Sequence, residues 1–193
     1  MRILLLLTAI GFCFTVDASE SLEWNAGVLV TVDGEVQQGE LAFQVSEIVL
    51  LKVADEVTVF PAHKVHSFRY YDLEENINRK FVSRASSLDN HFAFYEVVVS
   101  GKAGVIRKCK SIRVSNQKKS DKYGYDYFVF FENNLVSLNQ FRNKVYPDLI
   151  TSSNQMETLI KDHRLNPNRK ADAIQIIQLY NKVSYAETVV AGI

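Results

Sequence analysis

Residues 27–45 run Gly27-Val-Leu-Val-Thr-Val-Asp-Gly-Glu-Val-Gln-Gln-Gly-Glu-Leu-Ala-Phe-Gln-Val45 and carry the clearest fold signal in the chain. Two stretches rich in apolar and β-branched residues, 27–32 and 40–45, stand on either side of Asp33-Gly34. Such stretches favour extended backbone, and the glycine accepts the positive φ that a tight turn requires. The pattern therefore predicts an antiparallel β-hairpin near the start of the chain.

Similar stretches continue to about residue 138 and are again separated by turn residues. Gly101-Lys102 and Asn133-Asn134 mark two of these turns, because glycine and asparagine tolerate left-handed backbone. About ten short strands with local connections predict an antiparallel meander, either barrel-like or a sandwich. The further expected strands cover 47–53, 56–60, 64–71, 78–84, 92–100, 103–114, 123–131 and 135–138.

The pattern becomes helical after the last of these strands. Ser137 with Gln140, and Ser152 with Gln155, have the spacing of capping boxes, which begin helices. Asn166-Pro167 is typical of a third helix start, with proline in the first turn. Because short amphipathic helices are marginal alone, we expect two or three of them to pack on the sheet.

The N-terminus has the three parts of a secretory signal peptide in their usual order. Arg2 provides a positive charge, 3–14 is an almost unbroken apolar run, and Val16-Asp17-Ala18 offers small residues for cleavage near Ala18. Cys13 does not complete a lipidation site, because the bulky Phe12 precedes it. The apolar run is shorter than the roughly 20 residues that a membrane-spanning helix needs. The chain is thus expected to be exported, periplasmic or extracellular, and not an integral membrane protein.

The expected organisation is that of an α+β protein with one main domain. It comprises a signal peptide over 1–18, an antiparallel β domain over 19–138, a helical segment over 139–183 and a frayed tail over 184–193.

Charge and cysteine content narrow the possible partners and the means of stabilisation. The chain has 22 basic and 22 acidic residues, and the balance is unchanged when Arg2 and Asp17 leave with the signal peptide. A neutral chain does not indicate a nucleic-acid partner. Cleavage leaves Cys109 as the one cysteine, so an internal disulfide is impossible and the core must supply the stability.

Few residues in the chain suggest catalytic or metal chemistry. His63 and His66 are three apart, so on a strand they would point to opposite faces and would not share a metal ion, whereas on a turn after Pro61 they could. Polar residues on a half-exposed strand are the favoured interpretation. Cys109 lies between Lys108 and Lys110, but alternation places both lysines on the other face, which favours a structural thiol. Hence no catalytic residue, cofactor or metal ligand is predicted.

The most distinctive charged feature is a basic segment around the end of the 103–114 strand. One interpretation is a patch for an anionic partner, such as lipid headgroups or an acidic glycan. The other is a solvated hairpin and loop whose charge discourages edge-to-edge strand pairing. The candidate residues are Arg107, Lys108, Lys110, Arg113, Lys118, Lys119 and Lys122.

Several stretches of the chain also carry a family resemblance. They are 27–34 with 39–41, 57–68, 95–102, 126–131 with 135–138, 161–166 and 176–181. Together they resemble a family of uncharacterised exported β-rich proteins of Bacteroidota. The resemblance covers nearly the whole chain after the signal peptide and implies a β-rich domain with C-terminal helices. It transfers no catalytic residue.

These observations favour an exported cell-envelope protein that is a non-enzymatic binding or interaction module. Its partner would be an envelope protein, a glycan or a lipid. Two alternatives stay open. Aromatic residues on the strands, such as Phe94 and Phe128, could line a barrel cavity and make the protein a small-molecule or lipid carrier. A hydrolase with an unrecognised site is the other alternative.

The anionic-patch interpretation makes a direct prediction. Reversing the charge at Lys118 and Lys119, as in the double variant Lys118→Glu, Lys119→Glu, should weaken retention on anionic vesicles or lipopolysaccharide. Co-sedimentation with vesicles measures the retained fraction. Equal retention of the variant and the wild type would contradict the patch.

Overall fold

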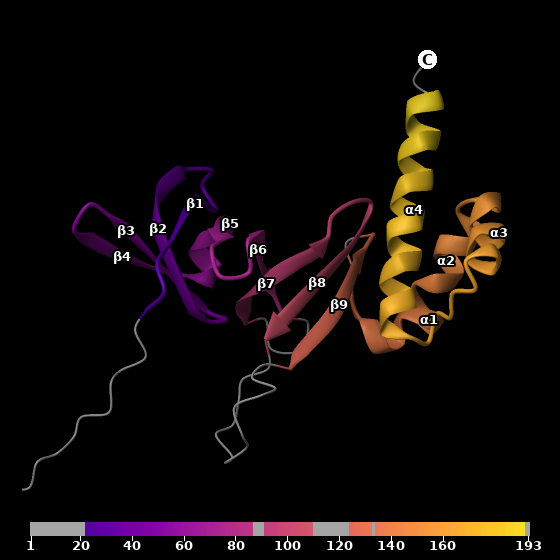
Figure 1. The fold of residues 1–193 in the computed structure, drawn as a ribbon, viewed down its shortest axis with the longest axis horizontal. Coiled ribbons are helices and arrows are strands. Elements are labelled where there is room, and N and C mark those ends of the chain that lie inside the picture. Colours follow the sequence, from indigo (N-terminus) through magenta and orange to yellow (C-terminus); the bar gives the residue numbers. More distant parts are fainter. Residues whose placement is uncertain (1–21, 87–90, 110–123, 133, 192–193) are drawn as a thin grey trace, which may run out of the picture.

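Ten strands and a group of helices follow one another along the described part of the chain (Figure 1). The structure, a computed structural model, describes residues 22–86, 91–109, 124–132 and 134–191. The expected signal peptide lies outside these residues. The strands are β1 (Asn25–Thr31), β2 (Val36–Val45), β3 (Ile48–Val53), β4 (Glu56–Pro61), β5 (Val65–Asp72), β6 (Ile77–Ala85), β7 (Phe92–Val99), β8 (Ala103–Cys109), β9 (Tyr125–Phe131) and β10 (Asn134–Ser137). The helices are η1 (Ala62–Lys64), η2 (Leu138–Gln140), α1 (Phe141–Lys144), α2 (Tyr146–Thr151), α3 (Asn154–Asp162) and α4 (Lys170–Ala191).

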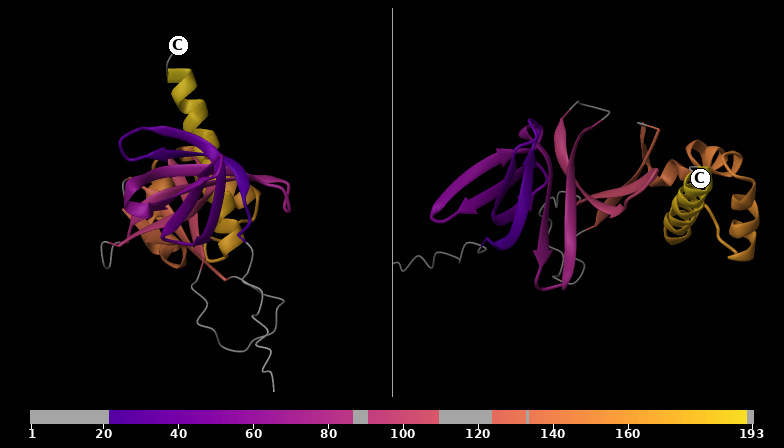
Figure 2. Two further views of the ribbon diagram at one scale, coloured as in Figure 1. Left: turned by 90° about the vertical axis from the view of Figure 1, so that its left-hand side faces the viewer. Right: turned by 90° about the horizontal axis from the view of Figure 1, so that it is seen from above.

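All ten strands belong to one antiparallel sheet, which confirms the predicted α+β class. The strand order is β10-β9-β8-β7-β6-β5-β1-β2-β3-β4, so β1 lies between β2 and β5. The sheet is open: β4 and β10 are its two edges, and a closed barrel is therefore excluded. The molecule is elongated, with β1–β4 at one end and the helices at the other (Figures 1 and 2).

The register defines two faces of the sheet, because directly paired residues place their side chains on the same side. One row of paired residues crosses six strands, and we call the face that carries it the inner face. The opposite side is the outer face. The row is Leu29, Phe68, Phe81, Glu96, Arg107 and Tyr127.

At the β1–β4 end, the sheet curls around an aromatic core on its inner face. The rings of Phe68 and Phe81 stack at 4.6 Å between centroids, and Phe43 packs on both. The curl brings distant segments together: the backbone N–H of Phe94 donates to the carbonyl of Ser46 at 2.6 Å. These contacts fill the space inside the curl with side chains.

Two glycines that face each other permit this curvature. Gly27 of β1 pairs directly with Gly39 of β2. A Cβ at Gly27 would lie 2.5 Å from the carbonyl oxygen of Arg69, and one at Gly39 would lie 2.4 Å from that of Lys52. Only residues without a side chain allow the neighbouring strands to approach so closely.

At the other end, the helices cover the inner face of β7–β10. Val105 and Val129 pair across β8 and β9, and both are fully buried beneath the helices. Ile177 and Tyr180 of α4 are buried in the same core, and the Tyr180 ring meets Phe131 edge-on at 5.9 Å. The expected packing of helices on the sheet is thus present.

One side chain fastens α4 to the sheet. The amide of Asn181 accepts a hydrogen bond from the backbone N–H of Ala103 at 2.9 Å and donates to the carbonyl of Ala103 at 2.8 Å. It reaches this position because Gly101, with φ of 152°, has no Cβ, which would lie 2.3 Å from the amide group. The pair therefore fixes α4 to the β7–β8 turn.

The helix ends differ in detail from the sequence prediction. Ser153, not Ser152, is the N-cap of α3 and accepts from the N–H of Gln155 at 3.4 Å. Asn166 forms a turn in which its side chain accepts from the N–H of Asn168, and α4 begins only afterwards. At its far end α4 continues to Ala191, beyond the expected tail start at 184, because no glycine or proline interrupts it.

The glycine contacts predict a contrast between two alanine substitutions. Gly39→Ala should lower the free energy of unfolding by about 2 kcal/mol or more, since the added methyl group meets backbone. Gly104→Ala is the matched control in the same sheet: its nearest atom would be 3.5 Å away, an ordinary contact. Urea denaturation of both variants measures the difference. Equal stability of the two would contradict the close approach at Gly39.

Candidate functional site

A chain of ion pairs lies on the inner face between the two cores. It runs across β5, β6, β7 and β8 through Asp72, Arg79, Glu96 and Arg107. Arg79 Nε donates to Asp72 at 2.6 Å, and its Nη1 donates to Glu96 Oε1 at 2.8 Å. Arg107 Nε donates to the other oxygen, Glu96 Oε2, at 2.7 Å. Both oxygens of Glu96 thus accept from a guanidinium.

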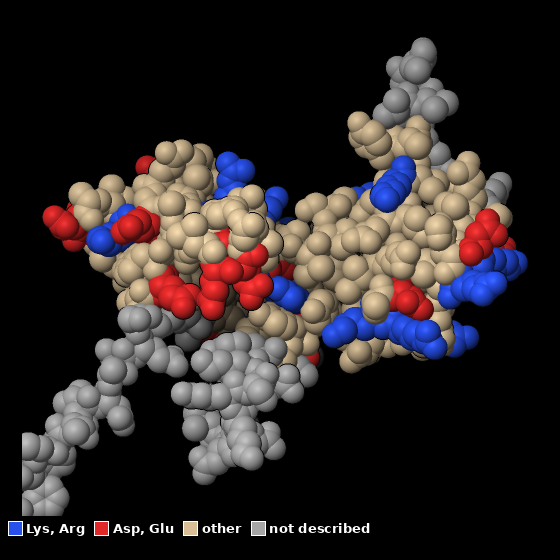
Figure 3. Space-filling view, viewed as in Figure 1, with Lys and Arg blue, Asp and Glu red and all other residues tan. Residues whose placement is uncertain are grey.

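Aromatic rings and the start of α4 continue this chain. The Arg107 guanidinium lies 4.1 Å from the centroid of the Tyr125 ring, a cation–π distance. The Lys170 ammonium, at the first residue of α4, lies 4.5 Å from the centroid of Tyr127. The charges therefore link the curled end of the sheet to the helical end. On the face seen in Figure 3, a cluster of acidic side chains lies on the strand end and a row of basic side chains lies on the helical end, each with a few charges of the other sign nearby.

The pKa shifts of the groups in and beside the ion-pair chain agree with stable ion pairs. Burial alone would lower the pKa of the Arg107 guanidinium, but the hydrogen bonds that it donates to Glu96 and Tyr127 outweigh burial and raise that pKa. The pKa of Asp72 is lowered by a hydrogen bond from the Glu75 backbone and by Arg79. Burial raises the pKa of Tyr70 to about 12, against the opposing effect of Arg79. Tyr70 is thus uncharged at neutral pH.

The ion-pair chain was not predicted from the sequence, although a signal for it exists. Glu96 and Arg107 each stand inside a strand that is otherwise apolar on this face. A charge in such a position usually has a partner, because an unpaired buried charge is costly. The strand partners of these two residues, however, follow only from the register. The arrangement joins the two cores and leaves Glu96 only 12% exposed in its side chain.

The predicted basic patch falls largely outside the described residues. Of its seven members, Arg107 and Lys108 are described, and they point to opposite faces of β8. Arg107 belongs to the ion-pair chain, whereas Lys108 pairs in register with Asp126 on the outer face. The structure therefore does not bring these two together, and the patch stays a prediction.

The histidines and Cys109 show no shared site in the described part of the chain. His63 lies in η1 and His66 on β5, both exposed, and no group of three His, Cys, Asp or Glu residues that could hold a metal occurs among the described residues. Burial raises the pKa of the Cys109 thiol, against the opposing effect of Arg107. A raised pKa disfavours the reactive thiolate at neutral pH.

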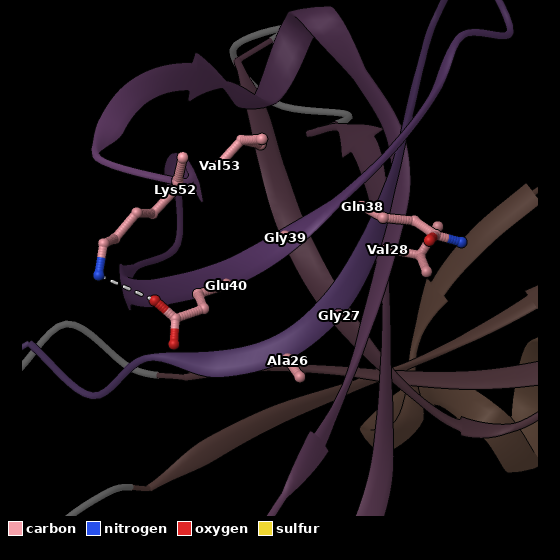
Figure 4. Close-up of a pocket in the computed structure, with 9 residues that line it drawn as sticks. Ala26, Gly27, Val28, Gln38, Gly39, Glu40, Lys52 and Val53 are labelled. Atoms are coloured by element: carbon pink, nitrogen blue, oxygen red, sulfur yellow. Dashed lines mark hydrogen bonds and ion pairs between the residues drawn. The ribbon is translucent and has the colours of Figure 1, made fainter.

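A hollow of about 710 Å³ lies over β1, β2 and β3 and is open to solvent (Figure 4). Its floor contains the paired glycines Gly27 and Gly39, and an ion pair of 3.0 Å joins Glu40 and Lys52 beside it. Figure 4 shows Gln38 turned away from that ion pair, so the polar groups do not converge on one point. The hollow thus lacks the convergent polar groups that fix a small ligand.

The free edge of the sheet at β4 presents backbone N–H and C=O groups that are not bonded within the sheet. The N–H of Ala62 donates to the carbonyl of Glu47 at 2.8 Å and continues the β3–β4 register, in which Pro61 lies opposite Ile48. Bonded and non-bonded pairs alternate along an antiparallel ladder. Backbone hydrogen bonds to β3 are therefore formed by Glu56, Thr58 and Phe60. The backbone N–H and C=O groups of Val57 and Val59 point away from the sheet.

Val57 and Val59 are accessible as well as unpaired. Their side chains are 47% and 57% exposed, and the backbone from Glu56 to Val59 belongs to exposed residues throughout. The other edge, β10, has only four residues and leads directly into η2 and α1, which packs against it. Natural sheets commonly protect their edges with short strands or with a covering helix of this kind. Within the described part of the chain, the edge at β4 is the one that remains available for pairing.

The ion-pair chain predicts a pH-dependent contribution to stability. Because the pKa of Asp72 is lowered in the folded state, its contribution is present above the unfolded pKa of about 3.9 and is lost as the pH falls through the folded value. Asp72→Asn should therefore cost about 1 kcal/mol at pH 7, and the gap from the wild type should narrow below about pH 4. Urea denaturation between pH 7 and pH 3 measures this gap.

Glu74→Gln, in the same turn, serves as the control for that series. Among the described residues, Arg79 forms ion pairs with Asp72 and Glu96 and not with Glu74, and the substitution retains the turn backbone. A gap for Asp72→Asn that stayed constant over the whole pH range would contradict the assigned role of Asp72.

Comparison with known proteins identified no relative of this chain. No family model, curated protein or solved structure matches it. The resemblance to exported Bacteroidota proteins therefore stays a prediction. Among the described residues, no helix combines the length and apolar character needed to cross a membrane.

Proposed function

We propose that the protein is an exported, non-enzymatic interaction module of the cell envelope that binds its partner by strand addition at β4. In strand addition, an extended segment pairs with an exposed sheet edge, and main-chain hydrogen bonds supply the affinity. The partner of such a module is a polypeptide. Among the partners expected from the sequence, an envelope protein is thus favoured over a glycan or a lipid.

A single observation carries this proposal: the outward N–H and C=O groups of Val57 and Val59 on an accessible edge. A long, exposed edge with apolar side chains is a ready template for pairing. The edge carries no lysine to discourage pairing, and proline occurs only at its end, at Pro61. An edge of this kind is explained if it is covered when the protein functions.

The packing gives less support to the two alternatives. A carrier needs an interior cavity, whereas the rings of Phe43, Phe68 and Phe81 contact one another inside the curl. A hydrolase needs convergent polar groups, whereas Glu96 and both of its arginine partners are engaged with one another. Export itself rests on the signal pattern of residues 1–18.

Proline substitution at the edge tests strand addition without disturbing the fold. Val59→Pro removes an N–H that points to solvent, and proline is tolerated at such positions of edge strands. Val59→Thr keeps the N–H and the β-branched shape. Tagged wild type should retain a polypeptide from fractionated envelopes in near-stoichiometric amount, Val59→Thr should retain most of it, and Val59→Pro should lose it.

The same preparation checks export, because mass spectrometry gives the mature N-terminus, expected after Ala18. Far-ultraviolet circular dichroism confirms that all three chains are folded. Equal capture by the wild type and Val59→Pro would show that β4 does not bind the partner, and a retained residue 1 would contradict export.

A further inference from the structure

We infer that the strand added at β4 comes from a second copy of this chain, which pairs β4 with β4 about a two-fold axis through Thr58. The inference rests on the proposed function and deepens it by naming the partner. Closed two-fold dimers are the commonest homo-oligomers, and each copy uses the same surface patch in them. The strand β4 must therefore be complementary to itself, and three properties of its residues make it so.

The first property is the direction of the backbone groups. In an antiparallel pair centred on Thr58, Val57 of one copy faces Val59 of the other, and the reverse pair is equivalent. Both valines have their N–H and C=O groups outward. Facing residues with outward groups form bonded pairs, so all four groups of the two valines find partners in each copy. Thr58 then faces its counterpart in a non-bonded pair, where threonine pairs are favourable.

The second property is the position of the apolar side chains. Val57 faces Lys52 and Val59 faces Leu50 on β3, so both valines lie on the outer face. They are 47% and 57% exposed. In the proposed register Val57 lies beside Val59 of the second copy, so the two facing pairs form one patch of four valines. Exposed apolar area that a single copy leaves in water is thereby covered.

The third property is the distribution of charge along the edge. Asp55 and Glu56 lie at the beginning of β4, and His63 and Lys64 follow its end in η1, all exposed. An antiparallel arrangement brings the acidic end of one strand toward the basic end of the other. Glu56 faces Phe60 and not a second Glu56, so like charges do not meet across the pair.

The shape of the molecule leaves room for this pairing. The β3–β4 hairpin lies at one end of the long axis and the helices at the other (Figures 1 and 2). Two copies joined at β4 would therefore place their helices at opposite ends of the dimer. The two ten-stranded sheets would continue into each other.

Cysteine cross-linking tests the register. Thr58→Cys places two cysteines in a non-bonded pair, where the Cα atoms are roughly 4.5 Å apart, within the range for a disulfide. Glu56→Cys is the matched control: the two cysteines would lie roughly 14 Å apart, from the rise per residue of a strand. Under mild oxidation the exported Thr58→Cys chain should become mostly a covalent dimer, and Glu56→Cys should not. Cys109 is present in both, so any cross-link through it appears equally.

Mass measurement provides a second readout without a new thiol. Light scattering over a dilution series should show the wild type passing from dimer to monomer. Val59→Pro should raise the dissociation constant about tenfold or more, because each dimer loses two hydrogen bonds. Val36→Thr is the control: it changes an exposed valine of β2, which is not an edge strand, and should leave the dissociation constant unchanged.

The outcomes separate this inference from the proposed function. A wild type that stays monomeric at all concentrations, with no preferred cross-link at Thr58→Cys, overturns pairing with a second copy. If Val59→Pro then still loses a foreign polypeptide from envelope fractions, strand addition stands and only its partner changes. If Val59→Pro changes neither mass nor capture, both proposals fail.

Discussion

The structure depends on covering the inner face of an open sheet. A closed barrel hides its interior by joining its edges, but here the edges stay apart and the apolar face must be covered by other means. At one end the sheet curls until its own aromatic side chains pack together. At the other end the helices lie over it. Glu96, paired with Arg79 and Arg107, lies on the part of the inner face between the two cores, which neither the aromatic core nor the helical core covers.

The individual strands and helices could be predicted because their signals are local. Alternating side chains, Asp33-Gly34 and Gly101-Lys102 each act over a few residues, and each described strand lies close to its expected position. The placement of β1 between β2 and β5 could not be predicted, since it pairs Leu29 with Phe68, about 40 residues away. The same holds for the curl, which depends on Gly27 meeting Gly39 across strands.

The candidate sites were harder to foresee than the fold. An ion pair such as Arg79 with Glu96 requires the register of two strands, and no spacing within the sequence encodes it. The edge at β4 is invisible for a similar reason: Glu56–Phe60 looks like any other strand until the sheet order places it at the end. The basic segment, by contrast, is conspicuous in the sequence, yet Arg107 turns inward to Glu96 instead of joining Lys108.

The pairing of β1 with β5 also has a consequence for how the chain folds. Every other pair of neighbouring strands is consecutive in the chain, so those hairpins can form quickly from local contacts. The contact between β1 and β5 instead closes a long loop, which costs more entropy before any bond is gained. Until it forms, β1 and β4 both present open edges. This interval is when the chain is most exposed to mispairing with its neighbours.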